Sequence, residues 1–246
     1  MLRFLCICII VIGFLIVMIP LLIAEWILGK FAPLKKDLSS LRIVQAAFRL
    51  IVWIAGVKVT VLGEEHVPKD TAVLYAANHR GCFDILLTYI RCRNRTGFIA
   101  KKELERYPLL SVWMRYLHCL FLDRQNLRNG VKTILEAAEK VTSGISIFIF
   151  PEGTRSKSES ELEMLPFHDG SFKIASKANC PVIPVAISNT ASLFEDHFPI
   201  VRPGHVIIRY GEPVYLNELE KEQKKYPGAY VQNIILEMLK KNQELL

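Results

Sequence analysis

A loop of seven residues between a strand pattern and a helix pattern decides how this chain folds. The loop is Asn78-His79-Arg80-Gly81-Cys82-Phe83-Asp84. The largely apolar residues 71–77 before it are typical of a buried strand, and a helical pattern begins at Ile85. In α/β proteins the loops at the carboxyl ends of strands carry the functional residues. We therefore expect an α/β fold whose chemistry lies in this loop.

Two side chains of the loop suit proton transfer. His79 can accept and return a proton near neutral pH. Asp84 lies five residues further on and can hydrogen-bond the imidazole, which would fix its tautomer. Gly81 would allow a tight turn between them. The alternative is a helix cap, in which Asp84 only satisfies the free N–H groups of the first turn.

Strand and helix patterns alternate along the rest of the chain, which indicates an α/β fold with a mixed, largely parallel sheet covered by helices on both faces. Strands are expected at residues 57–62, 72–76, 97–100, 146–150, 182–187 and 206–210. Helices are expected at residues 85–92, 109–117, 131–141 and 171–178, and a final helical segment at 218–245 is broken at Pro227-Gly228. We divide the chain into a membrane element at residues 1–56 and a catalytic domain at residues 57–246.

The first part of the chain indicates a membrane. Phe4–Ala24 contains no charged residue, and as a helix it would be about 31 Å long, enough to cross a bilayer. We expect an uncleaved anchor that ends near residues 20–25, and the basic residues after it predict a catalytic domain on the cytoplasmic face. A hairpin that enters one leaflet is the alternative.

A second apolar segment, Leu41–Val57, carries Arg42, Gln45 and Arg49 at helical spacing. One polar stripe beside a broad apolar face is typical of a helix in the membrane interface. A helix packed on the catalytic domain would show the same pattern.

The composition agrees with contact to lipid. Apolar residues make up 51% of the chain and the mean hydropathy is +0.27. The net charge is +7, and residues 1–63 hold seven Lys or Arg against two acids. A basic segment beside an apolar one indicates anionic lipid head groups, whereas no basic-aromatic motif predicts nucleic acid as a partner. The six cysteines have neither disulfide nor zinc spacing, which favours a reducing compartment and predicts no metal site.

Two blocks in this order resemble those of the glycerolipid acyltransferase superfamily, and within it the 1-acylglycerol-3-phosphate (lysophosphatidic acid) acyltransferases. The first block is Asn78-His79 with Asp84, and the second is Phe150-Pro151-Glu152-Gly153-Thr154-Arg155-Ser156. The resemblance extends from about Lys58 to about Gly211. It implies that His79 is the general base, that Asp84 orients it and that Asn78 braces the loop. This chain has Gly81 where the family usually has serine.

The resemblance also implies a phosphate site for the acceptor. Arg124 and Arg155 would each offer a planar fork of N–H donors, and Glu152 would orient Arg155 or the glycerol hydroxyls. Arg124 could instead form a surface pair with Asp123. His118 stands where many members have glycine. The other residues implied are Gly153 and Thr154 at the acceptor site, Lys102 and Lys173 behind it, and Val182, Ile183 and Pro184 as an acyl groove or a plain core strand.

The activity that the resemblance implies is transfer of an acyl group to the sn-2 hydroxyl of 1-acylglycerol-3-phosphate, which gives phosphatidic acid. The donor would be an acyl thioester, either acyl-CoA or acyl carrier protein, and no further cofactor is expected. Expected partners are the lipid bilayer and lysophosphatidic acid. The alternatives are transfer to another lyso-lipid, thioester hydrolysis, and a non-catalytic lipid-binding protein on the same fold.

Overall fold

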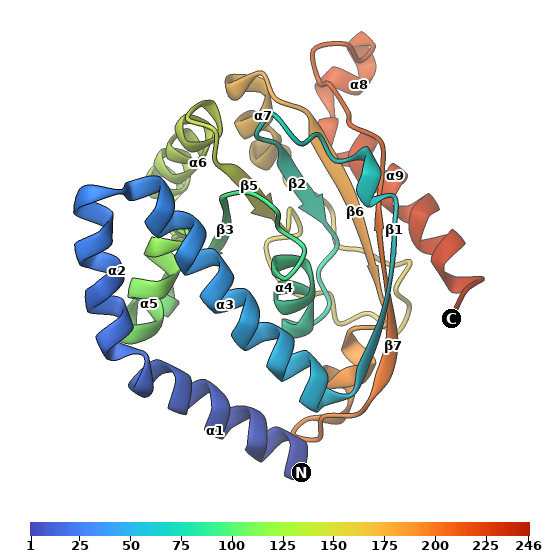
Figure 1. Ribbon diagram of the computed structural model, residues 1–246. Coiled ribbons are helices and arrows are strands. Elements are labelled where there is room, and N and C mark those ends of the chain that lie inside the picture. Colours follow the sequence, from blue (N-terminus) through green and yellow to red (C-terminus); the bar gives the residue numbers. More distant parts are fainter.

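The computed structural model describes all 246 residues except the side chain of Leu127. The described chain forms one seven-stranded sheet in the order β1-β7-β6-β2-β5-β3-β4 (Figure 1). The strands are β1 (Val57–Leu62), β2 (Leu74–Ala77), β3 (Thr96–Lys101), β4 (Leu120–Leu122), β5 (Ser146–Ile149), β6 (Val182–Ser188) and β7 (Gly204–Tyr210).

The sheet is mixed and largely parallel. Strands β6, β2, β5, β3 and β4 pair in parallel, β7 runs antiparallel to β6, and β1 pairs in parallel with β7. The predicted fold class is therefore confirmed, and six of the strands lie where the sequence predicts them. Strand β4 is not among the expected strands, because a strand of only three residues leaves too short an apolar run to be recognised.

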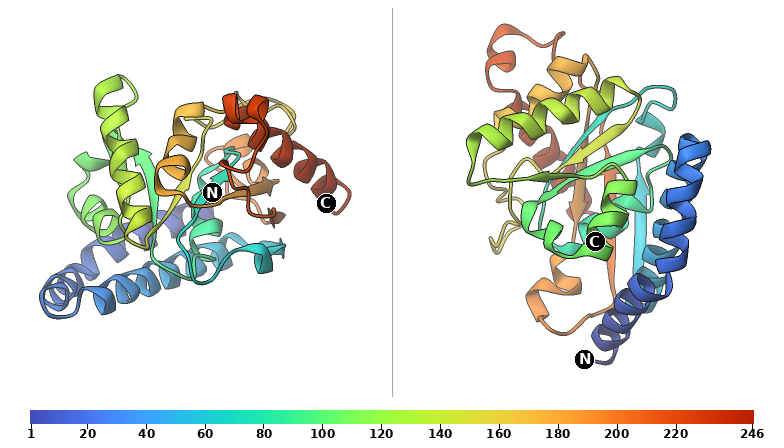
Figure 2. Two further views of the ribbon diagram at one scale, coloured as in Figure 1. Left: turned by 90° about the horizontal axis from the view of Figure 1, so that it is seen from above. Right: turned by 90° about the vertical axis from the view of Figure 1, so that its left-hand side faces the viewer.

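Helices cover both faces of this sheet, as Figure 2 shows. Helices α1 (Leu2–Val17), α2 (Ile19–Phe31) and α3 (Pro33–Ala55) lie on one side together with α4 and α5, and α6, α7 and α9 lie on the other. The bounds after the first three helices are α4 (Cys82–Tyr89), α5 (Pro108–Tyr116), α6 (Leu127–Thr142), α7 (Lys173–Ala178), α8 (Lys221–Lys225) and α9 (Pro227–Gln243). The predicted break at Pro227-Gly228 is the start of α9, where proline occupies the first helical position.

Alternate residues of the strands divide the core into two layers. Ile183, Val185 and Ile187 of β6 face the layer beneath α3, α4 and α5, whereas Val182 and Ala186 face the layer beneath α6, α7 and α9. This is the two-residue period of an extended chain. Because both faces are buried, the strand reads as a continuous apolar run and not as an alternating one.

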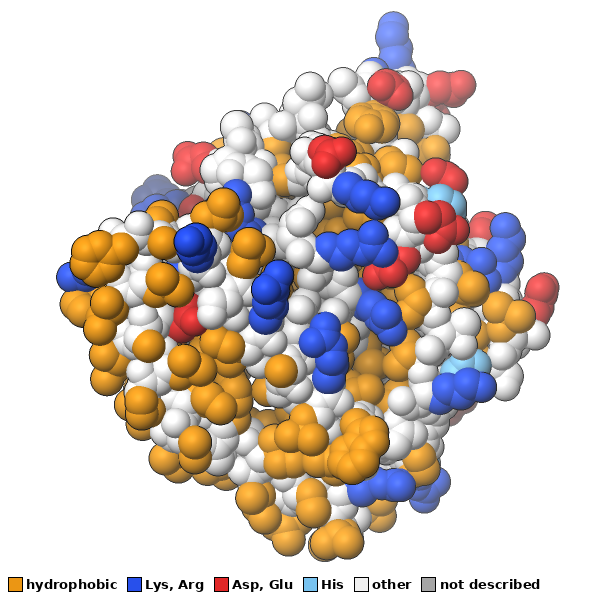
Figure 3. All heavy atoms as spheres, viewed as in Figure 1, with side chains coloured by type: hydrophobic (Ala, Val, Ile, Leu, Met, Phe, Trp, Pro, Cys, Tyr) orange, Lys and Arg blue, Asp and Glu red, His pale blue; other side chains and the backbone are white. Residues whose placement is uncertain are grey.

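The N-terminal segment consists of α1 (Leu2–Val17), α2 (Ile19–Phe31) and α3 (Pro33–Ala55). The anchor expected over residues 4–24 is not one continuous helix, because the chain bends by 50° between α1 and α2. Helix α3 is long and apolar enough to cross a membrane, and so is the bent pair if it is counted as one span. Hydrophobic side chains gather on the surface formed by these three helices (Figure 3).

Helix α3 packs on the domain and also exposes an apolar face. Gln45 is buried, and its amide nitrogen Nε2 donates to the carbonyl oxygens of Tyr89 (3.1 Å) and Cys92 (2.7 Å). The polar stripe expected for Arg42, Gln45 and Arg49 does not lie on one exposed face, because Arg42 and Arg49 are exposed to solvent and Gln45 is buried. The proposed boundary at residues 56–57 falls at the end of α3, although α3 shares a hydrophobic core with the sheet.

Candidate active site

Asn78 anchors the loop that follows β2. Its Nδ2 donates to the carbonyl oxygen of Ile187 (2.9 Å), and its Oδ1 accepts from the backbone N–H of Ile187 (2.8 Å). Ile187 belongs to β6, the neighbour of β2, so this buried side chain continues the pairing after β2 has ended. The histidine that follows is attached to a fixed point of the sheet.

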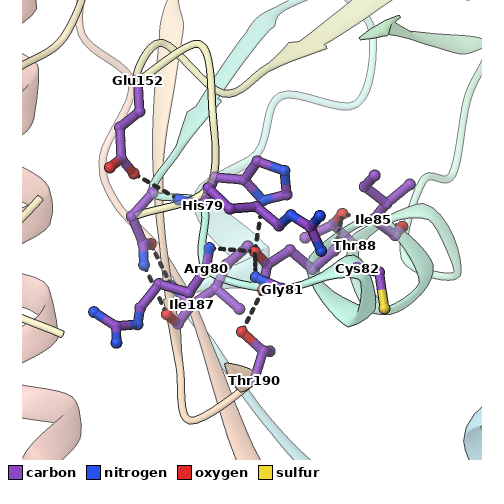
Figure 4. A network of polar contacts seen from close by, with 12 residues as sticks. His79, Arg80, Gly81, Cys82, Ile85, Thr88, Glu152, Ile187 and Thr190 are labelled. Carbon is purple, nitrogen blue, oxygen red and sulfur yellow. Dashed lines mark hydrogen bonds and ion pairs between the residues drawn. The ribbon is translucent and has the colours of Figure 1, made fainter. Parts of the chain in front are cut away.

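Asp84 accepts four hydrogen bonds at the start of α4. Figure 4 labels the residues that donate them, His79, Arg80, Gly81 and Thr190. Oδ2 of Asp84 accepts from His79 Nδ1 (2.8 Å) and from the backbone N–H groups of Arg80 (2.8 Å) and Gly81 (2.9 Å). Its Oδ1 accepts from the hydroxyl of Thr190. The carboxylate thus caps the helix and orients the imidazole at once, so the two readings of this residue are compatible.

The contact with Asp84 sets the tautomer of His79. An Nδ1–H that donates to the carboxylate leaves Nε2 with its lone pair free to accept a proton. The imidazole stacks on the ring of Phe150, with ring centroids 4.1 Å apart and planes 19° apart. One face of the ring is therefore covered, and His79 lines a cleft of about 1480 Å³.

Glu152 holds the backbone of the first block and does not contact Arg155. Its Oε1 accepts from the N–H of His79 (2.7 Å), and its Oε2 accepts from the N–H of Leu165 (2.8 Å). Burial raises the pKa of this carboxyl. Of the two roles expected for Glu152, orienting Arg155 is corrected, because Arg155 pairs with Glu195 instead, and orienting the glycerol hydroxyls stays a prediction. The buried Glu152 side chain ties the two sequence blocks together through main-chain donors.

The cleft brings together most of the residues expected at the acceptor site. Arg124, Gly153, Thr154, Arg155 and Lys173 all line it with His79. Gly153 has φ of 72°, in the left-handed region that favours glycine. The alternative for Arg124, a surface pair with Asp123, is not present among the described contacts, since Asp123 accepts from Lys102 Nζ (2.9 Å) instead. Lys102 lies beside the cleft residues Lys101 and Glu103 and is not itself among its described lining.

Arg155 is fixed by a carboxylate from a distant segment. Its Nη1 donates to Oε1 of Glu195 (2.8 Å), while half of its side chain (51%) stays exposed. Arg124 is exposed as well. Two guanidinium groups on one cleft supply the planar, charge-assisted donors that a phosphate group prefers.

The acyl groove expected at Val182, Ile183 and Pro184 is corrected by the structure. These residues are buried in β6, and none of them belongs to the described lining of the cleft. Their alternative reading as a core strand holds. The apolar part of the cleft is formed instead by side chains of α3, α4, α5 and the sheet, among them Phe48, Ile85, Tyr89, Phe98, Leu110 and Met114.

His118 adopts the backbone geometry that its place in the family pattern suggests. Its φ is 59°, in the left-handed region where glycine is most at ease. The imidazole ring of His118 contacts helix α3, where its Nε2 lies 2.8 Å from Oδ2 of the buried Asp37. Burial opposes the charge on Asp37, but His118 and Lys36 hold the pKa of its carboxyl below the usual value.

Several residues that shape the site were missed in the sequence. Thr190 and Glu195 reach it from the segment after β6, and Arg80 donates to the carbonyl oxygens of Ser158 (2.5 Å) and Ser160 (2.7 Å). All of these contacts join positions at least 78 residues apart, so no local pattern could reveal them. The tight turn expected at Gly81 is not present. With φ of −147° and ψ of 163° the backbone of Gly81 is extended, a conformation that any residue can adopt.

The fold and the site define an α/β enzyme in which an oriented imidazole faces a cleft with apolar walls and two arginines. The acyltransferase family model matches residues 58–188, more than half of the chain. The chain belongs to the acyltransferase family. Within the described residues there is no group of three His, Cys, Asp or Glu side chains that could hold a metal ion.

The proteins to which this chain is similar include 1-acyl-sn-glycerol-3-phosphate acyltransferases from several organisms. A 1-acyl-sn-glycerol-3-phosphate acyltransferase of Saccharomyces cerevisiae is 30% identical over 77% of this chain and 62% of its own length. A protein of the same name from Cocos nucifera is 30% identical over 80% of this chain and 63% of its own. The match thus spans less than two thirds of either relative.

The fold is also similar to a solved structure. The crystal structure of the 1-acyl-sn-glycerophosphate (LPA) acyltransferase PlsC from Thermotoga maritima superposes with a TM-score of 0.83 at 27% sequence identity. The alignment covers 98% of this chain and 95% of that one.

Proposed function

We propose that this protein transfers an acyl group from an acyl thioester to the sn-2 hydroxyl of 1-acylglycerol-3-phosphate and so forms phosphatidic acid. The observation that carries the proposal is the placement of His79, oriented by Asp84, on the same cleft as Arg124 and Arg155. The names of the similar proteins support the same acceptor.

In this mechanism Nε2 of His79 accepts the proton of the acceptor hydroxyl while the hydroxyl oxygen attacks the thioester carbonyl carbon. The tetrahedral intermediate collapses, the C–S bond breaks, and the proton passes from the imidazole to the leaving thiolate. The nucleophile is the substrate's own oxygen, so the protein supplies a base and not a covalent intermediate. Asp84 stabilises the imidazolium that forms between the two steps.

The acceptor is held at both ends. Arg124 and Arg155 bind the phosphate, and the apolar side chains of α3, α4 and α5 accommodate acyl chains. Gly153 and Thr154 border the phosphate end, and Lys173 adds positive charge there. The donor is acyl-CoA or acyl carrier protein, which serves as a substrate, and the scheme uses no resident cofactor.

In this proposal the cleft lies beside the bilayer, and the N-terminal helices support that position. Phe31 and Trp53 are among the most exposed apolar side chains, at 82% and 77%, and Phe48 of α3 lines the cleft. Helix α1 has 16 residues, about 24 Å, shorter than a hydrocarbon core of about 30 Å. The bend after it favours insertion into one leaflet. The basic residues that follow α2 favour the cytoplasmic leaflet.

An acceptor panel tests the proposal. The purified full chain in detergent is given labelled oleoyl-CoA or oleoyl carrier protein, with lysophosphatidic acid, lysophosphatidylcholine, monoacylglycerol or no acceptor, and products are read by mass. Phosphatidic acid as the main product supports the proposal. Free fatty acid formed without acceptor would indicate a hydrolase, and another acylated lipid would indicate a different acceptor.

A further inference from the structure

Glu195 joins the two halves of the site from a third segment. Its Oε1 accepts from the backbone N–H of Cys82 (2.8 Å), the first residue of α4, and from Nη1 of Arg155 (2.8 Å). Its side chain is 19% exposed, and Oε2 is buried without a hydrogen-bond partner among the described atoms. One carboxylate oxygen thus connects the helix that carries Asp84 to a guanidinium of the cleft.

Gly81 makes the space that this carboxylate occupies. A Cβ atom built on Gly81 would lie 2.7 Å from Oε2 of Glu195 and 3.2 Å from its Cδ. The extended backbone of Gly81 would accept any residue, so the requirement for glycine is one of volume. A side chain here would displace the carboxylate and separate it from Cys82 and Arg155.

We propose that Glu195 is a positioning residue that holds Arg155 in the orientation required to bind the acceptor phosphate. In this proposal glycine occupies position 81, where the family usually has serine, because a side chain there would overlap the carboxylate of Glu195. A serine at the N-cap of α4 would satisfy N–H groups of the first turn locally. In this chain Glu195 accepts from one of those groups and at the same time fixes Arg155, whose other N–H donors remain available. The inference rests on the proposed function in naming the phosphate.

Steady-state kinetics of the full chain test the role of Glu195. Glu195→Ala should raise KM for lysophosphatidic acid about tenfold and change KM for the acyl thioester less than about twofold. Glu195→Gln keeps the shape and one acceptor oxygen, so its loss should be about two- to fivefold. Arg155→Ala combined with Glu195→Ala should be no worse than Arg155→Ala alone. Asp196→Ala, an exposed acid next in the chain, is the matched control and should behave as wild type.

A double-mutant cycle tests the coupling to Gly81. Gly81→Ser should lower kcat/KM about tenfold or more in the wild-type background and less than about threefold in the Glu195→Ala background. Independent, multiplying losses would overturn the inference and leave the proposed function intact. Thermal unfolding gives a readout without substrate: Gly81→Ser should lower Tm more with Glu195 present than absent. If wild type forms no phosphatidic acid, the proposed function fails, and the unfolding cycle still decides whether the two positions are coupled.

Discussion

Oδ2 of Asp84 lies 2.8 Å from Nδ1 of His79, and the same oxygen accepts from the backbone N–H of Gly81, the N-cap residue of α4, from the first turn of that helix. The residue that orients the imidazole is therefore fixed by the helix it caps. An aspartate in the first turn interacts favourably with the helix dipole, so the orientation does not depend on a flexible side chain. The structural and the chemical roles of Asp84 reinforce one another.

Asp84→Asn should separate these roles. The amide keeps the size of the side chain but cannot offer two acceptor oxygens, so the imidazole loses its orienting carboxylate. We expect kcat to fall about 10²- to 10⁴-fold with KM for both substrates changed much less. Kinetics and circular dichroism on the same preparation check this. A folded Asp84→Asn protein with near wild-type kcat would contradict the orienting role.

Arg124→Ala and Arg155→Ala should act on the phosphorylated acceptor. Each removes one guanidinium from the cleft, so KM for lysophosphatidic acid should rise about tenfold or more, while KM for the acyl thioester stays within about twofold. Lys225→Ala, an exposed cation on α8, is the control. Equal effects of either arginine change on both substrates would assign a structural role to that arginine.

Cys82 should be unreactive although it lies in the loop. Burial, followed by the neighbouring carboxylate of Glu195, raises the pKa of this thiol to about 12. Only the thiolate is nucleophilic, so alkylation at pH 8 should be about a thousandfold slower than for a free cysteine. Mass spectrometry after iodoacetamide treatment of the native protein checks this. The Cys82→Ala variant should keep the acyl-transfer activity of wild type. A loss of that activity would mean that the thiol takes part in the reaction.

The buried amide of Asn78 should contribute strongly to stability. Asn78→Ala leaves the N–H and C=O of Ile187 without partners inside the sheet. We expect the free energy of unfolding to fall by about 2–4 kcal/mol. Denaturant unfolding measures it, with the exposed Asn94→Ala as control. A loss equal to that of the control would show that the loop does not depend on this bridge.

Membrane binding should depend on the exposed aromatic side chains of the N-terminal helices. Phe31→Ser and Trp53→Ser remove large apolar groups that face solvent, so partitioning to vesicles containing anionic lipid should fall about tenfold for the pair, with Tm unchanged. Vesicle flotation checks it. Tyr226→Ser, an exposed aromatic change on the far side of the sheet near α9, is the control. Flotation that is unaffected by the N-terminal pair would contradict the placement of the bilayer.

The sequence predicted what depends on neighbouring residues. Apolar runs such as Val182–Ser188 predict a strand that is buried on both faces. The contact between His79 and Asp84 could also be predicted, because the two residues are only five positions apart in the sequence. The bend after Val17 was not foreseen, since an apolar run fixes the length of a helix but not its direction.

The contacts that complete the site join distant positions. Glu152 accepts a hydrogen bond from the backbone N–H of His79, 73 residues away in the sequence. Glu195 accepts one from the backbone N–H of Cys82, 113 residues away. Such pairs follow from the order of strands β6, β2 and β5 in the sheet, which a single sequence does not reveal. The same reason explains why the sequence leaves two interpretations of Val182, a groove residue or a core residue: burial on both faces depends on which helices cover the strand.

Single-turnover transfer by purified His79→Ala protein tests the central claim most directly. With saturating lysophosphatidic acid and labelled oleoyl-CoA, wild type should form phosphatidic acid, and His79→Ala should lose at least about a thousandfold in rate with an unchanged unfolding transition. Phosphatidic acid formed by folded His79→Ala at a rate near that of wild type would contradict the account.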